Sequence, residues 1–202
     1  MKSQVNIISA ILILGISVGL VSLAYTWGLP LIQKRKDTTK FESLFSLFDP
    51  SNPNSLERLI TSIANKGGEE IVTLPYEGIW IINERENSIA LMIDSKISGI
   101  APDTYVSLLP GGSCPSGSKG RLGVDEPFEV CCFSKSMGTI FNITFKIWFR
   151  DLVDENGRIY RLKIFPLGSS SLKSKNLLLR FDPTNSFEKE DLVQKSVGIL
   201  LR

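Results

Sequence analysis

The feature that most constrains this chain is a run without a charged side chain, which extends from Val5 to Gln33 and ends at the basic cluster of residues 34–36. An α-helix rises about 1.5 Å per residue, so roughly 20 apolar residues cross the hydrocarbon core of a bilayer. The run is longer than that, which argues against the core helix of a soluble domain. Tyr25 and Trp27 lie near its end, where aromatic rings favour the headgroup level of a membrane. We therefore expect a transmembrane N-terminal helix over residues 4–48, with membrane lipid as its partner.

Small residues within the run allow another helix to approach closely, and they are Ser9, Gly15, Ser17, Gly19 and Ser22. The alternative is that they are ordinary membrane-helix composition. A secretory signal cleaved after Ala24 is a further alternative, because the tripeptide 22–24 offers a small-residue cleavage site. We favour a retained helix, since apolar sequence continues past that point through Trp27 and Ile32.

The overall composition excludes several functional classes. The chain has no histidine, which removes the commonest general base and the commonest transition-metal ligand. A net charge of +2 does not give the basic footprint that nucleic-acid binding needs. Catalysis by a serine–lysine pair is left as a formal alternative without a recognisable motif. We therefore expect a protein that is not an enzyme, uses no cofactor or metal, and does not bind nucleic acid.

Three cysteines, Cys114, Cys131 and Cys132, leave two interpretations open. In an oxidising compartment, Cys114 can form a disulfide with Cys131 or Cys132 and leave one free thiol. The alternative is that all three are small buried apolar residues. Their spacing does not resemble a zinc site, which needs pairs of ligands at two separated places.

Beyond the apolar run, the sequence predicts a break and then a short helix. The prolines of residues 49–53 end the first helix. An amphipathic helix is expected over residues 54–67, opening at Asn54 or Ser55, with Glu57 completing a capping box and a glycine pair following its end. Its apolar face is expected to pack on the rest of the domain as core.

From Ile71 onward the apolar residues recur with a period of two, which predicts strands. A hairpin is expected with its turn at residues 84–87, and the clearest alternation, at 140–149, predicts a central strand. Asn156-Gly157 is expected to be the hairpin turn that joins that strand to the next one. Further strands are expected at 105–109, 128–133, 158–165 and 177–181, and the stretch after Ser186 is left between helix and strand. The fold class is α+β, with an antiparallel β-sandwich head domain over residues 69–202.

Two local patterns superficially suggest ligand sites. The Gly/Ser-rich segment 111–120 lacks the order of a phosphate-binding loop, because Ser118 and not glycine precedes Lys119. Acidic residues around Asp151 and Asp154 suggest calcium, but without the spacing of an EF-hand. We expect an exposed loop at the first place and solvated turns at the second.

The first residues of the chain carry a resemblance to a known family. Met1-Lys2-Ser3-Gln4, followed directly by the apolar run, resembles the class III signal peptide of archaeal type IV pilins. The resemblance implies a leader of residues 1–3, cleavage between Ser3 and Gln4, and a helix that packs in a filament core or stays in the membrane. Bacterial pilins carry an acidic residue at the fifth mature position, where this chain has Ile8, and archaeal members tolerate that departure.

Two arguments about the side of the membrane disagree. The basic residues at 34–36 favour a cytoplasmic domain, whereas the resemblance implies an extracytoplasmic one. Long domains often translocate regardless of flanking charge, so we expect a single-pass cell-membrane protein with its C-terminal domain outside. Asn142-Ile143-Thr144 is a candidate glycosylation site, which is compatible with export although it lies in an expected strand.

The leading functional hypothesis is therefore a pilin-like subunit of a surface filament or appendage. Its helix would associate with copies of itself or with other pilin-like subunits. The alternative is a monomeric, surface-anchored binding module that does not polymerise.

Overall fold

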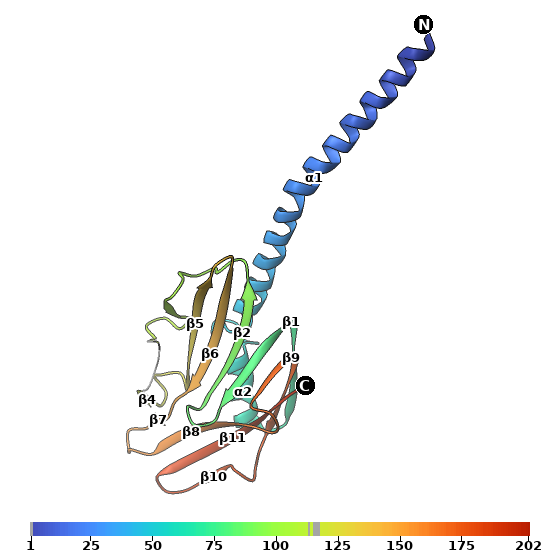
Figure 1. The fold of residues 1–202 in the computed structure, drawn as a ribbon. Coiled ribbons are helices and arrows are strands. Elements are labelled where there is room, and N and C mark those ends of the chain that lie inside the picture. The colour runs from blue at the N-terminus through green and yellow to red at the C-terminus, as the bar shows by residue number, and fades with distance from the viewer. Residues whose placement is uncertain (1, 113, 115–117) are drawn as a thin grey trace. The chain divides into compact units, whose positions relative to one another are not determined.

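The computed structural model describes residues 2–112, 114 and 118–202, with side chains from Ser9 onward. The chain forms two compact units, one ending at Thr39 and one covering Lys40–Arg202, which we call the head unit. Helix α1 (Lys2–Leu47) runs through the boundary between the units, and helix α2 (Leu56–Lys66) and the strands belong to the head unit (Figure 1). The long N-terminal apolar helix, the short second helix and the mostly β remainder that the sequence predicts are therefore present.

The described residues of the head unit form eleven strands joined in one curled sheet. The order along the sheet is β3-β5-β6-β2-β1-β9-β11-β8-β7-β4, and β10 attaches to β11. The strand bounds are β1 (Glu69–Asn83), β2 (Ser88–Ser95), β3 (Tyr105–Ser107), β4 (Gly120–Arg121), β5 (Phe128–Met137), β6 (Ile140–Phe149), β7 (Leu152–Val153), β8 (Ile159–Pro166), β9 (Ser171–Phe181), β10 (Phe187–Glu188) and β11 (Leu192–Leu201). The α+β class is confirmed in outline, whereas a sandwich of two separate sheets is not.

Strand β1 shows why the strands can share one sheet. It pairs with β9 at Glu69–Thr73 and again at Gly78–Ile81, with a shift of register between the two stretches. Its last residues also pair with β2, so β1 continues from one part of the sheet into the other. Pro75 lies in the shifted segment and has no N–H to donate to a neighbouring strand. An irregularity of this kind bends a strand, which allows a single sheet to curl around its core.

The expectation of a purely antiparallel sheet is wrong, because β11 runs parallel to β8 and β4 runs parallel to β7. Strands β8 and β9 are consecutive in the chain, yet β11 lies between them. It pairs parallel with β8 and antiparallel with β9. The stretch after Ser186 thus forms β10 and β11. Nothing in its local sequence specifies that it inserts between two earlier strands.

The turn at Asn156-Gly157 is present, but it joins different strands from those expected. Gly157 has φ 84° and its N–H donates to the Asp154 carbonyl at 3.1 Å. The turn connects β7 to β8, whereas the predicted connection of β6 to β8 is wrong. Strand β6 pairs instead with β2 on one side and β5 on the other. The chain leaves β6 at Arg150 and starts the short strand β7 before it turns.

The core of the head unit lies between the sheet and the helical residues that cover it. Phe48, directly after the end of α1, is fully buried and stacks on Phe145 of β6 with ring centroids 4.9 Å apart. Trp80 of β1 is also fully buried and lies 6.3 Å from the Phe48 ring. Leu56 and Ile60 of α2 are fully buried in the same cluster, as their spacing predicts. The ring of Phe48 therefore joins the segment after α1 to the sheet.

The capping box predicted at the start of α2 is wrong. The cap residue is Ser55, whose side chain makes no capping hydrogen bond. Glu57 is then the second helical residue, one position short of the place from which a glutamate closes a capping box. Its side chain is buried instead, and among the described residues neither carboxylate oxygen has a hydrogen-bond partner. Burial raises the pKa of Glu57 above its ordinary value, since a carboxylate loses its hydration there.

Candidate functional site

Helix α1 exposes apolar side chains around its whole circumference. Over residues 9–32 the large apolar side chains are exposed, with Leu14 at 67% and Trp27 at 75%. Its apolar stretch is long and apolar enough to span a membrane. The Thr26 hydroxyl donates to the carbonyls of Ser22 and Leu23, both at 3.1 Å, so its polar group is satisfied within the helix. These features are consistent with a single-pass anchor.

The Ser3–Gln4 bond lies in the first turn of α1, whereas Met1 of the expected leader 1–3 and the side chains up to Ile8 are outside the described part of the structure. Further along the helix, nothing lies within 4 Å of a side chain built at Gly15 or Gly19. The surface at these glycines is therefore open to a neighbouring helix.

Two of the three cysteines form a disulfide. Cys114 is bonded to Cys131 of β5, with Cα atoms 6.1 Å apart. Cys132 follows Cys131 on the same strand, so its side chain points to the opposite face, into the core. Burial raises the pKa of the Cys132 thiol to about 12, which keeps it protonated and unreactive near neutral pH. Of the pairings left open by the sequence, the structure has Cys114–Cys131, with Cys132 as a buried free thiol.

Asn142, the candidate glycosylation residue, lies within β6 with paired strands on both sides. Its side-chain amide donates to the Asp94 carboxylate of β2 at 3.0 Å. On the other side its Cα is in register with Lys135 of β5. The acceptor nitrogen is thus already engaged in a contact between strands.

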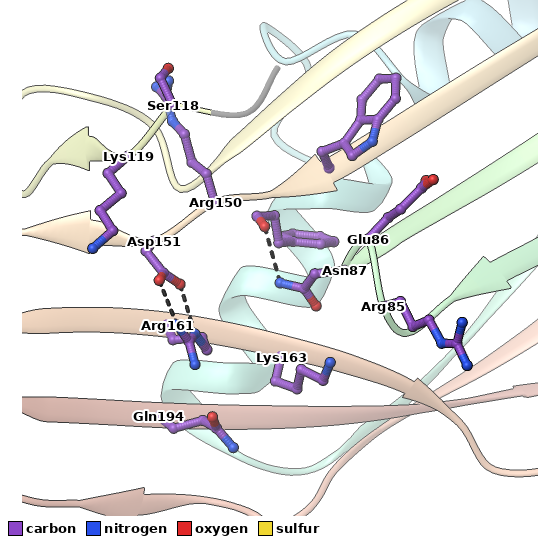
Figure 2. Close-up of a pocket in the computed structure, with 12 residues that line it drawn as sticks. Arg85, Glu86, Asn87, Ser118, Lys119, Arg150, Asp151, Arg161, Lys163 and Gln194 are labelled. Carbon is purple, nitrogen blue, oxygen red and sulfur yellow. Dashed lines mark hydrogen bonds and ion pairs between the residues drawn. The ribbon is translucent and has the colours of Figure 1, made fainter. Parts of the chain in front are cut away.

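A cleft of about 470 Å³ in the described part of the head unit is lined by seven charged side chains. The turn between β1 and β2 supplies Arg85, Glu86 and Asn87, and the residues at and after the end of β6 supply another wall. Strands β8 and β11 and the residues before β4 complete it (Figure 2). The cationic residues that line it are Arg85, Lys119, Arg150, Arg161 and Lys163, against the carboxylates of Glu86 and Asp151.

Asn87 holds the walls of this cleft together. Its backbone φ is 52°, a left-handed conformation that asparagine tolerates better than most residues. Its side-chain amide donates to the carbonyls of Phe149 at 3.0 Å and Leu162 at 2.6 Å. Its side-chain carbonyl accepts from the N–H of Ile164 at 2.9 Å. Beyond Tyr160 the edge of β8 that faces away from β11 is not paired with β7, so Asn87 takes the place of the missing strand and connects β6 to β8.

Ion pairs fix several of the charged side chains of the cleft. Arg161 donates to both carboxylate oxygens of Asp151, at 2.8 and 2.6 Å (Figure 2). This hydrogen bonding raises the pKa of Arg161 and keeps both charges in place. Arg150 donates to the buried carboxylate of Glu129 at 2.8 Å. It also donates to the backbone carbonyl of Glu126 at 2.9 Å, so its guanidinium supports the wall.

The second carboxylate that lines the cleft, that of Glu86, is neutralised by a lysine side chain. Lys146, on β6, donates to it at 2.6 Å. That hydrogen bond lowers the pKa of Glu86, so the carboxylate is charged near neutral pH. The Lys146 ammonium also lies 4.3 Å from the centroid of the Trp148 ring, which lines the cleft.

The sequence interpretation did not find this cleft. Residues of both local patterns considered there line it, namely Ser118 and Lys119 of the Gly/Ser-rich segment and Asp151 of the acidic one. Asp151 pairs with Arg161, while Asp154 accepts from the N–H groups of Asn156 and Arg158, both at 2.9 Å. The Gly/Ser-rich segment includes positions 113 and 115–117, which lie outside the described residues. The side chains of the cleft come from distant segments, and no spacing in the sequence connects them.

The chain was compared with protein-family models, curated proteins and solved structures, and nothing in these comparisons matches it.

Proposed function

We propose that this chain is a membrane-anchored, pilin-like subunit whose helix α1 resides in the membrane or in the core of a surface filament. The observation that carries the proposal is the contrast along one helix. Its N-terminal part is apolar all round and exposed, whereas Leu44 near its end and the following Phe48 are fully buried in the core of the head unit. A helix that is apolar all round needs apolar surroundings, which lipid or sister helices would supply.

The proposed subunit has the finer features that the sequence suggested. These are an archaeal class III leader cut between Ser3 and Gln4, a sandwich-like head on the extracytoplasmic side, and no enzymatic role. The Cys114–Cys131 disulfide supports an extracytoplasmic head, because such bonds persist in oxidising compartments and are rare in a reducing cytoplasm. Membrane lipid and other copies of the chain are the proposed partners of α1, and Asn142 remains a candidate for glycosylation.

The experiment that tests the leader is mass spectrometry of the N-terminal peptide of the native protein. The proposal predicts a mature chain that begins at Gln4. A peptide that retains Met1 would refute the pilin-like hypothesis and indicate an ordinary, uncleaved signal-anchor helix. A start at Tyr25 would show that the helix is removed as a secretory signal.

Electron microscopy of cells with and without the gene tests polymerisation. Loss of a surface filament in the deletion strain, and its return on complementation, is the expected result. Unchanged filaments, together with the protein in the membrane fraction as a monomer, would favour the alternative of an anchored binding module.

A further inference from the structure

The outer face of the sheet, opposite the core, carries a row of apolar side chains that crosses five neighbouring strands. Side chains alternate between the two faces of a strand, and Phe145 of β6 is buried in the core, so Thr144 points outward. The residues in register with Thr144 on the strands beside β6 share its face (Figure 1). Together they form what we call the apolar stripe: Ile79 of β1, Met92 of β2, Thr144 of β6, Phe133 of β5 and Tyr105 of β3.

The apolar stripe is accessible from outside the head unit. Ile79 is 45% exposed and Tyr105 is 49% exposed, while the three residues between them are half-buried. The rings of Tyr105 and Phe133 stack with their centroids 4.6 Å apart. The solvated face of an antiparallel sheet is ordinarily polar. A continuous apolar row on such a face therefore indicates a surface that another molecule covers.

The next outward row along the same strands is polar and has opposite charges on its two sides. In this row Asp94 of β2 and Lys135 of β5 flank Asn142 of β6. Both charged side chains are exposed, and among the described residues neither forms a salt bridge. Because β6 lies between them, their backbones are about 10 Å apart. Each charge is therefore available to a partner that approaches the outer face.

These two rows are complementary to themselves. Two copies of the chain that pack face to face about a two-fold axis parallel to β6 would place β2 of one copy over β5 of the other. Asp94 of each copy would then face Lys135 of the other copy. In the apolar stripe, Met92 would face Phe133 in the same way. Thr144 would lie at the axis, where its small side chain allows the two sheets to approach closely.

The row on the other side of the apolar stripe limits the extent of this contact. Its residue on β6 is Lys146, which would lie near its own counterpart at the axis. The Lys146 ammonium donates to the Glu86 carboxylate at 2.6 Å, so its charge is already neutralised. On β5 the same row holds Cys131, whose disulfide brings Cys114 to this face. The contact therefore covers the apolar stripe and the charged row, and not the whole face.

A contact of this extent is small. Five strands about 4.8 Å apart and two rows about 7 Å apart cover roughly 300–400 Å² per copy, about half of what each partner contributes to a standard interface. Free molecules would associate weakly through such a surface. Copies anchored in one membrane meet at a raised local concentration, which favours a weak contact.

We propose that the apolar stripe binds the same stripe of a second copy of this chain, with Asp94 and Lys135 forming ion pairs between the copies. The inference rests on the membrane anchoring in the proposed function and assigns a second contact to the head unit, beside the association of α1. A two-fold contact closes on a pair of subunits. It therefore joins two heads and does not by itself extend a filament.

Chemical cross-linking of the full chain in phosphatidylcholine vesicles tests the contact. Thr144→Cys places one reactive thiol at the proposed axis, and a short bismaleimide should link it to the same position of the second copy. The matched control is Thr184→Cys, at an exposed turn outside the stripe. We expect at least about tenfold more covalent dimer from Thr144→Cys. The wild type should give almost none, because its free thiol, that of Cys132, is buried.

Exchange of the two charges tests the ion pairs. In the Thr144→Cys background, Lys135→Glu and Asp94→Lys each place like charges opposite one another and should lower the yield of dimer about fivefold or more. The double variant Asp94→Lys/Lys135→Glu restores opposite charges and should recover most of the yield. Lys175→Glu makes the same charge change as Lys135→Glu at an exposed position outside the two rows, and should leave the yield unchanged. Thermal unfolding of each variant shows whether the head unit is intact.

Three results would overturn the inference. Equal cross-linking at positions 144 and 184 would show that copies meet through α1 alone. Failure of the double variant to recover the yield, with the head unit folded, would remove the proposed pairing of charges. Cross-linking of Thr144→Cys in cells to a different protein, without a dimer, would assign the stripe to another partner. None of these results changes the N-terminal start at Gln4, so the two proposals fail separately.

Discussion

Replacing Asn87 with alanine should destabilise the head unit more than its half-buried position suggests. The substitution removes the hydrogen bonds of the side-chain amide to Phe149, Leu162 and Ile164. Each is worth about 0.5–1.5 kcal/mol in net stability. Alanine at φ 52° adds about 1 kcal/mol, because its Cβ is disfavoured in the left-handed region. The expected loss is therefore about 3–5 kcal/mol, which is a large part of the stability of an ordinary domain.

Urea unfolding of the full chain in detergent, followed by tryptophan fluorescence, measures this loss, since Trp80 and Trp148 lie in the head unit. For a domain of this size, the expected decrease in the midpoint of thermal unfolding is about 10 °C. Asn87→Gly loses the same hydrogen bonds but tolerates the backbone angle, so it should recover about 1 kcal/mol relative to Asn87→Ala. The matched control is Asn156→Ala, at an exposed turn, which should cost no more than about 0.5 kcal/mol.

The reasoning would be refuted if Asn87→Ala changed the stability by less than about 1 kcal/mol, a shift typical of a surface substitution. Full recovery in Asn87→Gly would be equally informative. It would show that the backbone angle, and not the connection between β6 and β8, determines the cost.

Three further predictions concern the core and its chemistry. Cys114→Ala removes the disulfide between Cys114 and Cys131, which are 17 residues apart in the sequence, and should lower the free energy of unfolding by about 3 kcal/mol. Urea unfolding measures this decrease, and the wild type with its disulfide reduced should show the same decrease. Phe48→Ala removes a ring stacked on Phe145 and should cost about 3–5 kcal/mol, whereas Phe187→Ala, at an exposed site, is the control that should cost far less. Burial raises the pKa of Glu57 above 4.5, so the stability that Glu57 contributes is fully present below that pH and is lost as pH rises through the raised pKa. Glu57→Gln should therefore be more stable than wild type at neutral pH and lose that advantage towards pH 4.5, and a difference that did not change with pH would contradict this.

The elements that the sequence predicted well are those specified by local pattern. Strand β6 has the bounds expected from its alternation, with Ile143, Phe145 and Ile147 buried. The turn at residues 84–87 joins β1 and β2 as expected. In both cases the period of two and the turn residues determine the structure without reference to distant segments.

The features that the sequence did not predict depend on contacts between distant segments. Strand β11 pairs with β8 and β9 because it fills the space between them, and its own composition cannot specify that choice. The cleft has the same origin, since Arg85 and Arg161 line one cleft only when β8 lies beside the β1–β2 turn. The sequence indicated Asn87 only as a turn residue. Its role in connecting β6 to β8 follows from the curl of the sheet.

The disulfide and the basic residues after the apolar run favour opposite sides of the membrane, and their physical strengths differ. Positive charge next to a span biases insertion, but the bias is weak for a domain as long as the head unit. A disulfide depends on the redox potential of the compartment in which the folded protein resides. In a reducing cytoplasm, Cys114 and Cys131 would lose the bond that closes the loop between them, while Cys132 would stay inert in the core. The Cys114–Cys131 disulfide therefore supports the extracytoplasmic head of the proposed function more strongly than the flanking charges oppose it.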